Sequence, residues 1–403
     1  MSHFVEEIYF FVIKEHYFPK QAEAYPKNRL QVQMSDAMII GQTIVQGGTY
    51  ESCVYRTIPF GTIYRASRVP ASGSAQSPLP KRLWLRTPDT SAAAEGIRRE
   101  AAEAGPCSRG IEALDGPWSR VHLGVLADGL TPETLSRMFA RSAAMPHGDA
   151  DALQEKLTVL RRLIHSGALP YSPAEADAEL DDWRKNGFPA CRHSEEYRAA
   201  YRPAYRVLHR TYVRLLPLLA AIDRALAENP RGLLAIQGGA ASGKSTLADL
   251  LTAIYPDTVL FHADDFFLRP EQRTAARYAQ PGGNLDRERL ESEILIPISR
   301  NKAAVYRPFN CRTLSLREPV TVLPGRLNIV EGSYSFHPEL ARYYDLSVFL
   351  DISPETQRSR ILKRNGPEWG QQFFDRWIPL EQIYFHETDT KGRCTLALKE
   401  ETR

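Results

Sequence analysis

The residues from Gly238 to Ser245 have the spacing G-x-x-x-x-G-K-S, within the stretch LLAIQGGAASGKSTLADLL. Loops of this pattern wrap a phosphate chain closely, because glycine lets backbone N–H groups approach the phosphates and point inward. The lysine reaches the β and γ phosphates of a nucleotide, and the next hydroxyl binds Mg²⁺. We therefore expect a nucleoside triphosphate site with Lys244 on the phosphates and Ser245 on the metal. Its expected residues are Gly238, Gly239, Ala240, Ala241, Ser242, Gly243, Lys244, Ser245 and Thr246.

Two adjacent carboxylates, Asp264 and Asp265, follow an apolar run in the stretch TVLFHADDFF. Neighbouring like charges repel, so such a pair lies on a wet surface or shares a cation. A strand ending at this point in an open parallel sheet would bring them to the crevice where the phosphate loop also opens. Mg²⁺ and Lys244 would then keep both carboxylates ionised. For Asp265 three roles stay open: contact with Mg²⁺ through water, contact with an acceptor, or capping of the next turn.

Short apolar runs alternate with helical patterns from residue 231 onward. This alternation predicts an α/β fold in which helices cover both faces of a parallel sheet. The expected strands are 233–237, 258–262, 327–331, 346–350 and 394–398. The run after the loop has apolar residues at i, i+3, i+4 and i+7, as in a helix that lies on a sheet. These are Leu247, Leu250, Leu251 and Ile254.

Two classes of P-loop protein are disfavoured by missing motifs. A GTPase carries N-K-x-D to bind guanine, whereas the only similar run here, NKAA at Asn301, lacks the aspartate. A transporter-type ATPase carries L-S-G-G-Q, which is absent. A small-molecule kinase is therefore favoured over both.

Five elements follow one another in order: GGAASGKST, HADDFF, GGNLDRERL, IVEGSY and LDISPETQRSRILKRNG. In this order they resemble the uridine kinase and phosphoribulokinase-like P-loop kinases, over about residues 230–400. The resemblance implies ATP and Mg²⁺ as cofactors and a small molecule, a nucleoside or related metabolite, as the partner. The implied reaction is transfer of the γ-phosphoryl group to a hydroxyl of that molecule.

The resemblance also implies roles for three acidic residues. Asp264, the first acid of its motif, approaches the acceptor hydroxyl as its base or orienter. Asp286 holds sugar hydroxyls of the acceptor or, as the alternative, caps the helix that follows it. Glu331 ends an apolar strand, where a Walker B acid faces the Mg²⁺-bound phosphates.

A basic helix is expected from Ser353 to Asn365-Gly366. Arg360 and Arg364 lie four residues apart in it and therefore on one helix face. As a lid, this helix would stabilise charge on the transferred phosphoryl group and exclude water. The alternative is a solvated basic face.

The stretch AVYRPFNCRTLS occupies the place where pyrimidine nucleoside kinases read the base. Tyr306 and Phe309 could stack on a ring, but the acid and the histidine of those kinases are missing, so uridine is not indicated. Arg307 and Arg312 equally favour an anionic acceptor such as a sugar phosphate. The expected acceptor-site residues are Asp265, Asp286, Tyr306, Phe309 and Arg312.

The composition sets limits on the whole chain. Its 403 residues suggest two or three domains, and 43% hydrophobic and 25% charged residues are near globular averages. A net charge of +3 is too small to indicate nucleic acid or a membrane as partner. The five cysteines lack metal-ligand spacing and are typical of a cytoplasmic protein with reduced thiols. Neither a signal peptide nor a membrane span is expected.

Three regions are expected along the chain. Residues 1–80 are irregular or β-rich, with the runs CVYRTI and TIYRAS and a linker-like stretch, VPASGSAQSPLPK. Residues 82–229 begin with the strand, helix, strand pattern of RLWLR, SAAAEGIRREAAEAG and RVHLGVL, and then become helical. Helix starts are predicted at Thr131 and Ser172, each followed by proline and an acid. Residues 230–403 form the kinase domain.

The stretch EYRAAYRPAYR repeats a Tyr-Arg pair every four residues. Interleaved arginine and aromatic residues could bind nucleic acid through charge and stacking. The favoured alternative is a helix boundary at Pro203, with the tyrosines packed on the neighbouring domain and the arginines solvated. Because the net charge is small, a nucleic acid partner is not expected. A further rival to the kinase is a P-loop ATPase that senses nucleotide and signals through the helical region.

Overall fold

The computed structural model describes residues 37–46, 49–59, 90–105, 110–114, 116–145, 150–169, 171–185, 198–200 and 202–399. The chain divides into two compact units, Met1–Leu216 and Pro217–Arg403, which are described one at a time. The expected runs TIYRAS, VPASGSAQSPLPK and RLWLR lie outside the described residues. Within the described ranges, no helix combines the length and the apolar character needed to cross a lipid bilayer.

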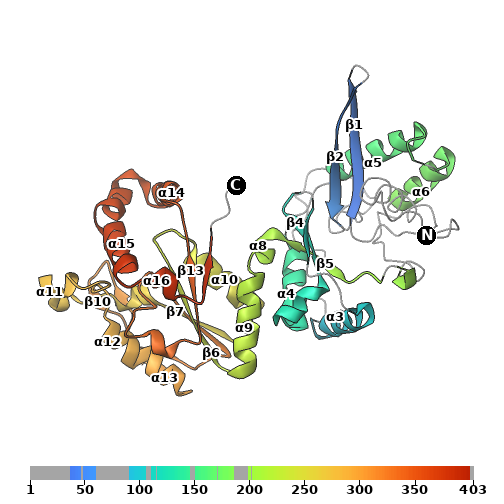
Figure 1. The fold of residues 1–403 in the computed structure, drawn as a ribbon. Helices are drawn as coiled ribbons and strands as arrows, with labels where there is room; N and C mark the ends of the chain where they lie inside the picture. Colours follow the sequence, from blue (N-terminus) through green and yellow to red (C-terminus); the bar gives the residue numbers. More distant parts are fainter. Residues whose placement is uncertain are drawn as a thin grey trace, which may run out of the picture. The chain divides into compact units, whose positions relative to one another are not determined.

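A five-stranded parallel sheet forms the centre of the carboxyl-terminal unit (Figure 1). Its strand order is β14-β13-β6-β12-β7, and every neighbouring pair is parallel. The strands are β6 (Gly232–Gly238), β7 (Thr258–His262), β12 (Leu327–Glu331), β13 (Leu346–Leu350) and β14 (Leu396–Leu398). All five coincide with expected runs, so the predicted α/β fold of this unit is confirmed.

Helices cover both faces of this sheet, which is why every residue of β6 and β12 is buried. On one face, α10 (Lys244–Ile254) buries Leu247, Leu251 and Ile254, three of the four residues of the predicted apolar stripe, and the fourth, Leu250, is half-buried. In Figure 1, α9 (Leu216–Glu228) and α10 lie on one side of the strands, and α12 (Arg287–Leu290) and α13 (Ile296–Ser299) lie on the other. The loop between β6 and α10 is thus anchored at both ends.

The second face packs on an aromatic-rich core. The helical segment formed by α12, η5 (Glu291–Leu295) and α13 contributes Leu290 and Ile294 to this core. Phe266 stacks on Tyr306 with ring centroids 5.5 Å apart. Phe266 is the last residue of η3 (Ala263–Phe266), so this stacking fixes the short turn that carries both predicted carboxylates.

The remaining elements of the unit connect these layers. They are η4 (Pro270–Gln272), α11 (Ala275–Tyr278), β8 (Ala304–Tyr306), β9 (Phe309–Asn310), β10 (Ser315–Leu316), β11 (Val320–Val322), η6 (Ala341–Tyr343), α14 (Pro354–Gln372), η7 (Phe373–Trp377), α15 (Ile378–Glu387) and α16 (Thr390–Arg393). Ser353 caps α14 by accepting the Thr356 N–H, and the helical geometry breaks at Gly366, where φ is 74°. Both points agree with the expected limits of the basic helix.

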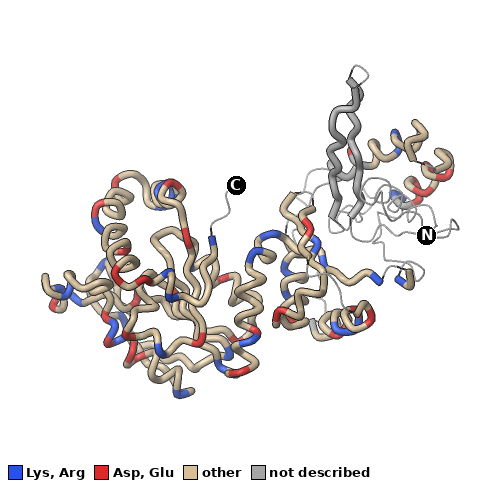
Figure 2. The backbone as a smooth tube through the Cα atoms, in the orientation of Figure 1, with Lys and Arg blue, Asp and Glu red and all other residues tan. Residues whose placement is uncertain are grey.

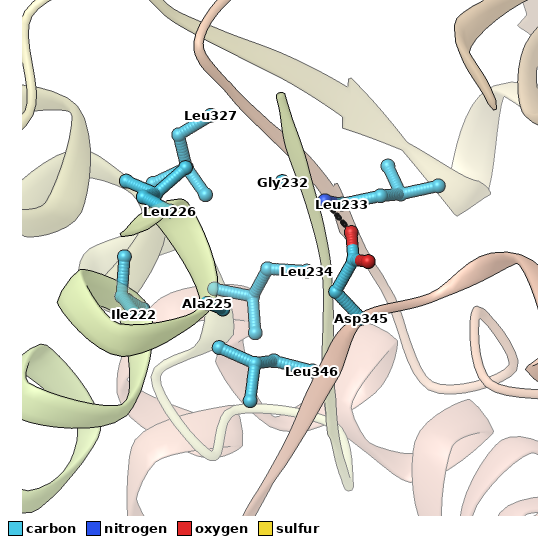
Figure 3. Close-up of a pocket in the computed structure, with 9 residues that line it drawn as sticks. All are labelled: Ile222, Ala225, Leu226, Gly232, Leu233, Leu234, Leu327, Asp345 and Leu346. Carbon is cyan, nitrogen blue, oxygen red and sulfur yellow. Dashed lines mark hydrogen bonds between the residues drawn. The ribbon is translucent and has the colours of Figure 1, made fainter. Parts of the chain in front are cut away.

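Helix α9 lies almost entirely in the carboxyl-terminal unit, because the chain divides after Leu216, the first residue of this helix. The sequence placed this boundary near residue 230 instead. Ile222 and Leu226 of α9 line the small pocket drawn in Figure 3. Leu234 and Leu327, from the amino ends of β6 and β12, line it from the sheet. The pocket is therefore an apolar packing site at the edge of the sheet opposite the phosphate loop.

Replacing Leu226 with alanine should lower the free energy of unfolding of this unit by about 2–4 kcal/mol, because a buried side chain is lost and a cavity remains. Leu226 is 6% exposed. Urea unfolding of the full chain measures the effect. Leu323, which is 71% exposed, is the control, and its replacement by alanine should change stability by less than about 0.5 kcal/mol. Equal midpoints for the two variants would contradict the assignment of α9 to this unit.

The described part of the amino-terminal unit contains an antiparallel sheet of order β3-β4-β5. Thr131 caps α4 by accepting the Thr134 N–H, as the sequence predicted. The expected helix at residues 91–105 is also present, as α3. The elements of this unit are β1 (Ala37–Gln46), β2 (Thr49–Pro59), α3 (Thr90–Ala104), β3 (Ile111–Ala113), β4 (Trp118–His122), η2 (Leu123–Asp128), α4 (Pro132–Ala143), α5 (Ala150–His165), α6 (Pro173–Lys185), β5 (Tyr205–His209) and α8 (Arg210–Val213).

Two local predictions for this unit are wrong. Strand β5 lies inside the region predicted to be helical, because its residues pair with β4, a partner far away in the sequence. The strand expected in RVHLGVL ends at His122, and the short helix η2 takes the rest of that run. In both cases the limits of the strand are set by the pairing between β4 and β5, which are far apart in the sequence.

The described end of the Tyr-Arg repeat is packed within its own unit. Arg206 donates to the carboxylate of Glu100 at 2.6 Å, and the guanidinium of Arg120 lies 4.8 Å from the centre of the Tyr205 ring. Tyr197 and Tyr201 of the repeat lie outside the described residues. Figure 2 shows cationic and anionic residues interspersed along the described elements. Tyr205 is thus packed, as the favoured interpretation expected, but against its own unit, and Arg206 is paired with Glu100 instead of being solvated.

Candidate active site

The loop from Gly238 to Gly243 joins the end of β6 to the start of α10. Gly238 has a φ of 145°, and a Cβ atom there would lie 2.6 Å from the carbonyl oxygen of Leu350, so only glycine fits. Across the described residues, the N–H groups of Ala241 and Gly243 meet no hydrogen-bond acceptor. Free N–H groups at the positive end of a helix are suited to binding a phosphate group.

The side chain of Lys244 folds back over this loop. Its Nζ atom donates to the carbonyl oxygens of Gly238 at 2.9 Å and Gly239 at 3.0 Å. A third hydrogen bond, of 3.3 Å, goes to the hydroxyl of Ser333. The ammonium group is therefore held at the loop by neutral acceptors, which the charged oxygens of a phosphate would replace with stronger hydrogen bonds.

Ser245 and Glu331 are in contact, as their predicted shared role requires. The Ser245 hydroxyl donates to Oε1 of Glu331 at 3.1 Å, and Nδ1 of His262 lies 2.8 Å from the same oxygen. Burial raises the pKa of Glu331, but the hydrogen bond with His262 and the charge of Lys244 outweigh it, so the pKa is lowered. The same hydrogen bond raises the pKa of His262. Glu331 is thus held as a carboxylate.

The donor set at Ser245 and Glu331 fits Mg²⁺. A hydroxyl and a carboxylate are hard oxygen ligands, and Mg²⁺ usually completes its shell with waters and nucleotide phosphates. Among the residues that the structure describes, no group of three or more His, Cys, Asp or Glu could hold a metal ion. Ser245 and Glu331 would supply part of the shell of such an ion, and waters and phosphates would supply the rest.

His262 is a site residue that the sequence analysis missed. It is the last residue of β7 and the register partner of Glu331 in β12. The only sequence signal is its place immediately before the two carboxylates. Its contact with Glu331 depends on which strands are neighbours, and local patterns do not give the strand order.

Asp264 and Asp265 follow β7 in η3, at the edge of the sheet where the phosphate loop lies, as expected from parallel strands. Asp264 can be reached by solvent, yet protein surrounds it on most sides. This burial raises its pKa, against the opposing charge of Lys244. Burial likewise raises the pKa of Asp265, opposed chiefly by His262. Asp264 therefore lies within the field of Lys244, whereas Asp265 lies within that of His262 and neighbouring arginines.

Asp286 is buried, with 1% of its surface exposed, and it caps α12. Its Oδ1 atom accepts the N–H of Arg289 at 3.3 Å, and its Oδ2 atom accepts from the side chain of Gln272 at 2.8 Å. The structure thus gives Asp286 the capping role that was the alternative, and contact with sugar hydroxyls stays a prediction.

The aromatic residues expected in the acceptor pocket pack in the core. Tyr306 lies against Phe266, and Phe309 is 3% exposed with the guanidinium of Arg273 over its ring, 5.7 Å from the centre. Arg312 is exposed in the segment that follows. The structure therefore uses both rings for packing, and their stacking on a ligand stays a prediction.

The basic helix α14 reaches the loop through one of its two predicted arginines. Arg360 donates to the carbonyl oxygen of Ala241 at 3.2 Å. Arg364 instead lies over the ring of Phe373, at 5.5 Å, and donates to the side chain of Asn365. Only Arg360 is brought to the phosphate loop in this structure.

Two further residues of the carboxyl-terminal helices contact the loop. Gln357 of α14 and Glu381 of α15 both form hydrogen bonds with the backbone of Ala240. The sequence analysis missed both, because each is one polar residue in a helical pattern with no motif around it.

Comparison with known proteins gives likenesses in structure. No family model and no curated protein matches the sequence. The structure is similar to that of a possible uridine kinase from Bacillus stearothermophilus, with 18% identity and a TM-score of 0.34, over 45% of this chain and 98% of that one. It is also similar to D-glycerate 3-kinase from Cryptococcus neoformans var. grubii, with 17% identity and a TM-score of 0.33, over 44% of this chain and 91% of that one.

Proposed function

We propose that the carboxyl-terminal unit is an ATP- and Mg²⁺-dependent kinase that phosphorylates a hydroxyl of a small molecule, a nucleoside or a related metabolite. The observation that carries the proposal is the meeting of three groups at one edge of the sheet. These are the P-loop with Lys244, the contact between Ser245 and Glu331, and the carboxylate of Asp264. A nucleotide, a metal ion and a hydroxyl acceptor each have a matching group there.

Each group has a task in such a reaction. Mg²⁺, held by Ser245 and Glu331 together with the nucleotide, would neutralise charge on the β and γ phosphates. When the nucleotide binds, the ammonium group of Lys244 would donate to phosphate oxygens in place of the carbonyl oxygens of Gly238 and Gly239. Asp264 accepts the hydrogen bond of the acceptor hydroxyl and takes its proton as the hydroxyl oxygen attacks the γ phosphorus. The bond from that phosphorus to the β–γ bridging oxygen breaks at the same time, and ADP leaves. Arg360, beside the loop, adds positive charge near the transferred group.

A metabolite screen tests this proposal. The full chain is incubated with ATP, Mg²⁺ and pools of nucleosides, sugars and sugar acids, and mass spectrometry searches for a gain of one phosphoryl group. A phosphorylated metabolite that forms only with protein, ATP and Mg²⁺ supports the kinase. ATP turnover without any phosphorylated metabolite would instead support the rival, a nucleotide-sensing ATPase.

A second candidate is a kinase with an anionic acceptor, such as a sugar phosphate. Arginine charges surround the carboxylate turn: Arg289 and Arg317 act on Asp265, and Arg273 and Arg317 act on Cys311. Arg289 is already paired with Glu293 at 2.8 Å. Arg317 is exposed, and no ion pair joins it to any other described residue. Its guanidinium is therefore free to bind a carboxylate or a phosphate group in two-pronged fashion.

If the acceptor is anionic, Arg317→Ala should raise the KM for the acceptor by at least about 10-fold, since an exposed charge-assisted contact is lost. The KM for ATP should stay unchanged. Steady-state kinetics with the acceptor found in the screen measure both values. Arg300→Ala, a change at another exposed arginine of the same unit, is the control. Equal KM values for wild type and Arg317→Ala would exclude this role.

A further inference from the structure

The backbone N–H and carbonyl groups of Ala240 both form hydrogen bonds with side chains of the carboxyl-terminal helices α14 and α15. Oε2 of Glu381, from α15, accepts the Ala240 N–H at 2.8 Å. Nε2 of Gln357, from α14, donates to the Ala240 carbonyl oxygen at 3.0 Å. The two side chains are only 5% and 6% exposed. Buried polar groups that are fully hydrogen-bonded fix a backbone conformation strongly, since losing one partner leaves the other unsatisfied.

The second oxygen of Glu381 links this contact to the lysine of the loop. Oε1 accepts from the Ser333 hydroxyl at 2.6 Å, and the same hydroxyl oxygen accepts from Nζ of Lys244 at 3.3 Å. One buried carboxylate thus touches the loop backbone and, through Ser333, its catalytic lysine. The carboxylate of Glu381 therefore fixes the position of the Ala240 peptide group relative to the Lys244 side chain.

Gly239 supports this interpretation independently. The G-x-x-x-x-G-K-S pattern accepts any residue at this position, yet the chain has glycine there. A Cβ atom on Gly239 would lie 2.8 Å from Nε2 of Gln357 and 3.6 Å from Oε2 of Glu381. A larger residue would therefore push the Gln357 amide away from its contact with Ala240.

We propose that Glu381 is a positioning residue that, with Gln357, holds the P-loop in its phosphate-receiving shape before nucleotide arrives. Because the Ala240 N–H is directed to Glu381, the free N–H groups of Ala241 and Gly243 stay exposed to the incoming phosphates. Preorganisation of this kind raises affinity by removing the cost of ordering the loop on binding. The inference rests on the proposed function only for the nature of the ligand, a nucleotide.

The test compares Glu381→Ala, Glu381→Gln and the control Glu387→Ala, a change at an exposed acid of the same helix. Hydrogen exchange without nucleotide and calorimetric binding of the ATP analogue AMP-PNP with Mg²⁺ are measured on the full chain. In Glu381→Ala, the Ala240 amide should exchange at least about 10-fold faster, and AMP-PNP should bind about 10- to 100-fold more weakly. Glu381→Gln should stay within about 3-fold of wild type, since its amide can accept from Ala240 and contact Ser333.

Gln357→Ala gives a second test that removes only the contact on the carbonyl side, and it decides the question if Glu381→Ala does not fold. It should weaken AMP-PNP binding by about 10-fold, and the effects of the two alanine changes should not be additive, because they act on one segment. Exchange and affinity equal to those of Glu387→Ala, in either variant, would overturn the proposal. If wild type binds AMP-PNP but phosphorylates no hydroxyl, the kinase proposal fails and this one stands. If wild type binds no nucleotide, the kinase proposal fails and hydrogen exchange alone decides this one.

Discussion

Replacing Lys244 with alanine is expected to lower kcat/KM for phosphoryl transfer by about 10³-fold, the scale of losing one preorganised charge in an active site. The lysine lies over the loop carbonyls and is the group that would hold the β and γ phosphates. The variant should also bind AMP-PNP more weakly than wild type does. Steady-state kinetics with the acceptor from the screen, and calorimetry with AMP-PNP, measure the two effects.

Lys302→Ala is the matched control for this change, because Lys302 is an exposed lysine of the same unit. It should leave both quantities unchanged. A Lys244→Ala protein with wild-type turnover and a wild-type urea midpoint would show that the P-loop does not serve phosphoryl transfer.

Replacing Asp264 with asparagine is expected to separate nucleotide binding from chemistry. Asparagine keeps the size of the side chain but cannot take a proton, so kcat should fall by about 10²- to 10⁴-fold, the usual contribution of a general base. AMP-PNP affinity should not weaken, because removing a negative charge near Lys244 does not disfavour the phosphates. Single-turnover kinetics measure the rate of phosphoryl transfer, and calorimetry measures the affinity for AMP-PNP. Both are carried out on the same preparation of Asp264→Asn and of wild type.

The pH dependence of kcat/KM supplies an independent check on Asp264. A base works in its deprotonated form, so activity falls as pH drops through its pKa. Burial raises the pKa of Asp264, and the acid limb should therefore begin at a higher pH than for an ordinary aspartate. That limb should be absent from the residual activity of Asp264→Asn and present in Asp265→Asn. Wild-type turnover in Asp264→Asn would remove Asp264 from the catalytic role.

Sequence patterns predicted the parts of the site that depend on local order. The strand before Gly238, the helix after it and the run before Asp264 each carry their own periodicity. Parallel strands end at one edge of a sheet, so the meeting of the P-loop, Glu331 and the carboxylate turn also followed from the sequence. The pattern thus identified both the α/β fold of the carboxyl-terminal unit and the ends of the strands at which the loop lies.

The contacts that the sequence did not give are those between residues that share no local pattern. His262 contacts Glu331 because β7 and β12 are neighbours in the sheet. The sequence of neither strand predicts which strand lies beside it. Tyr306 has the composition of a ligand-stacking residue, but the ring of Phe266 already covers it. Strand β5 was missed for the same reason, since its partner β4 lies far away in the chain.

The hydrogen bond between Ala240 and Glu381 joins residues 141 positions apart. A chain emerging from the ribosome therefore displays its P-loop long before α15 exists to hold it. Domains fold as units during synthesis, and long-range contacts form late because closing a long loop is entropically costly. The nascent loop would meet cellular ATP in an unsecured state, and its final shape is acquired only once α15 has been made. The ability to bind nucleotide would thus be acquired only after synthesis has passed α15.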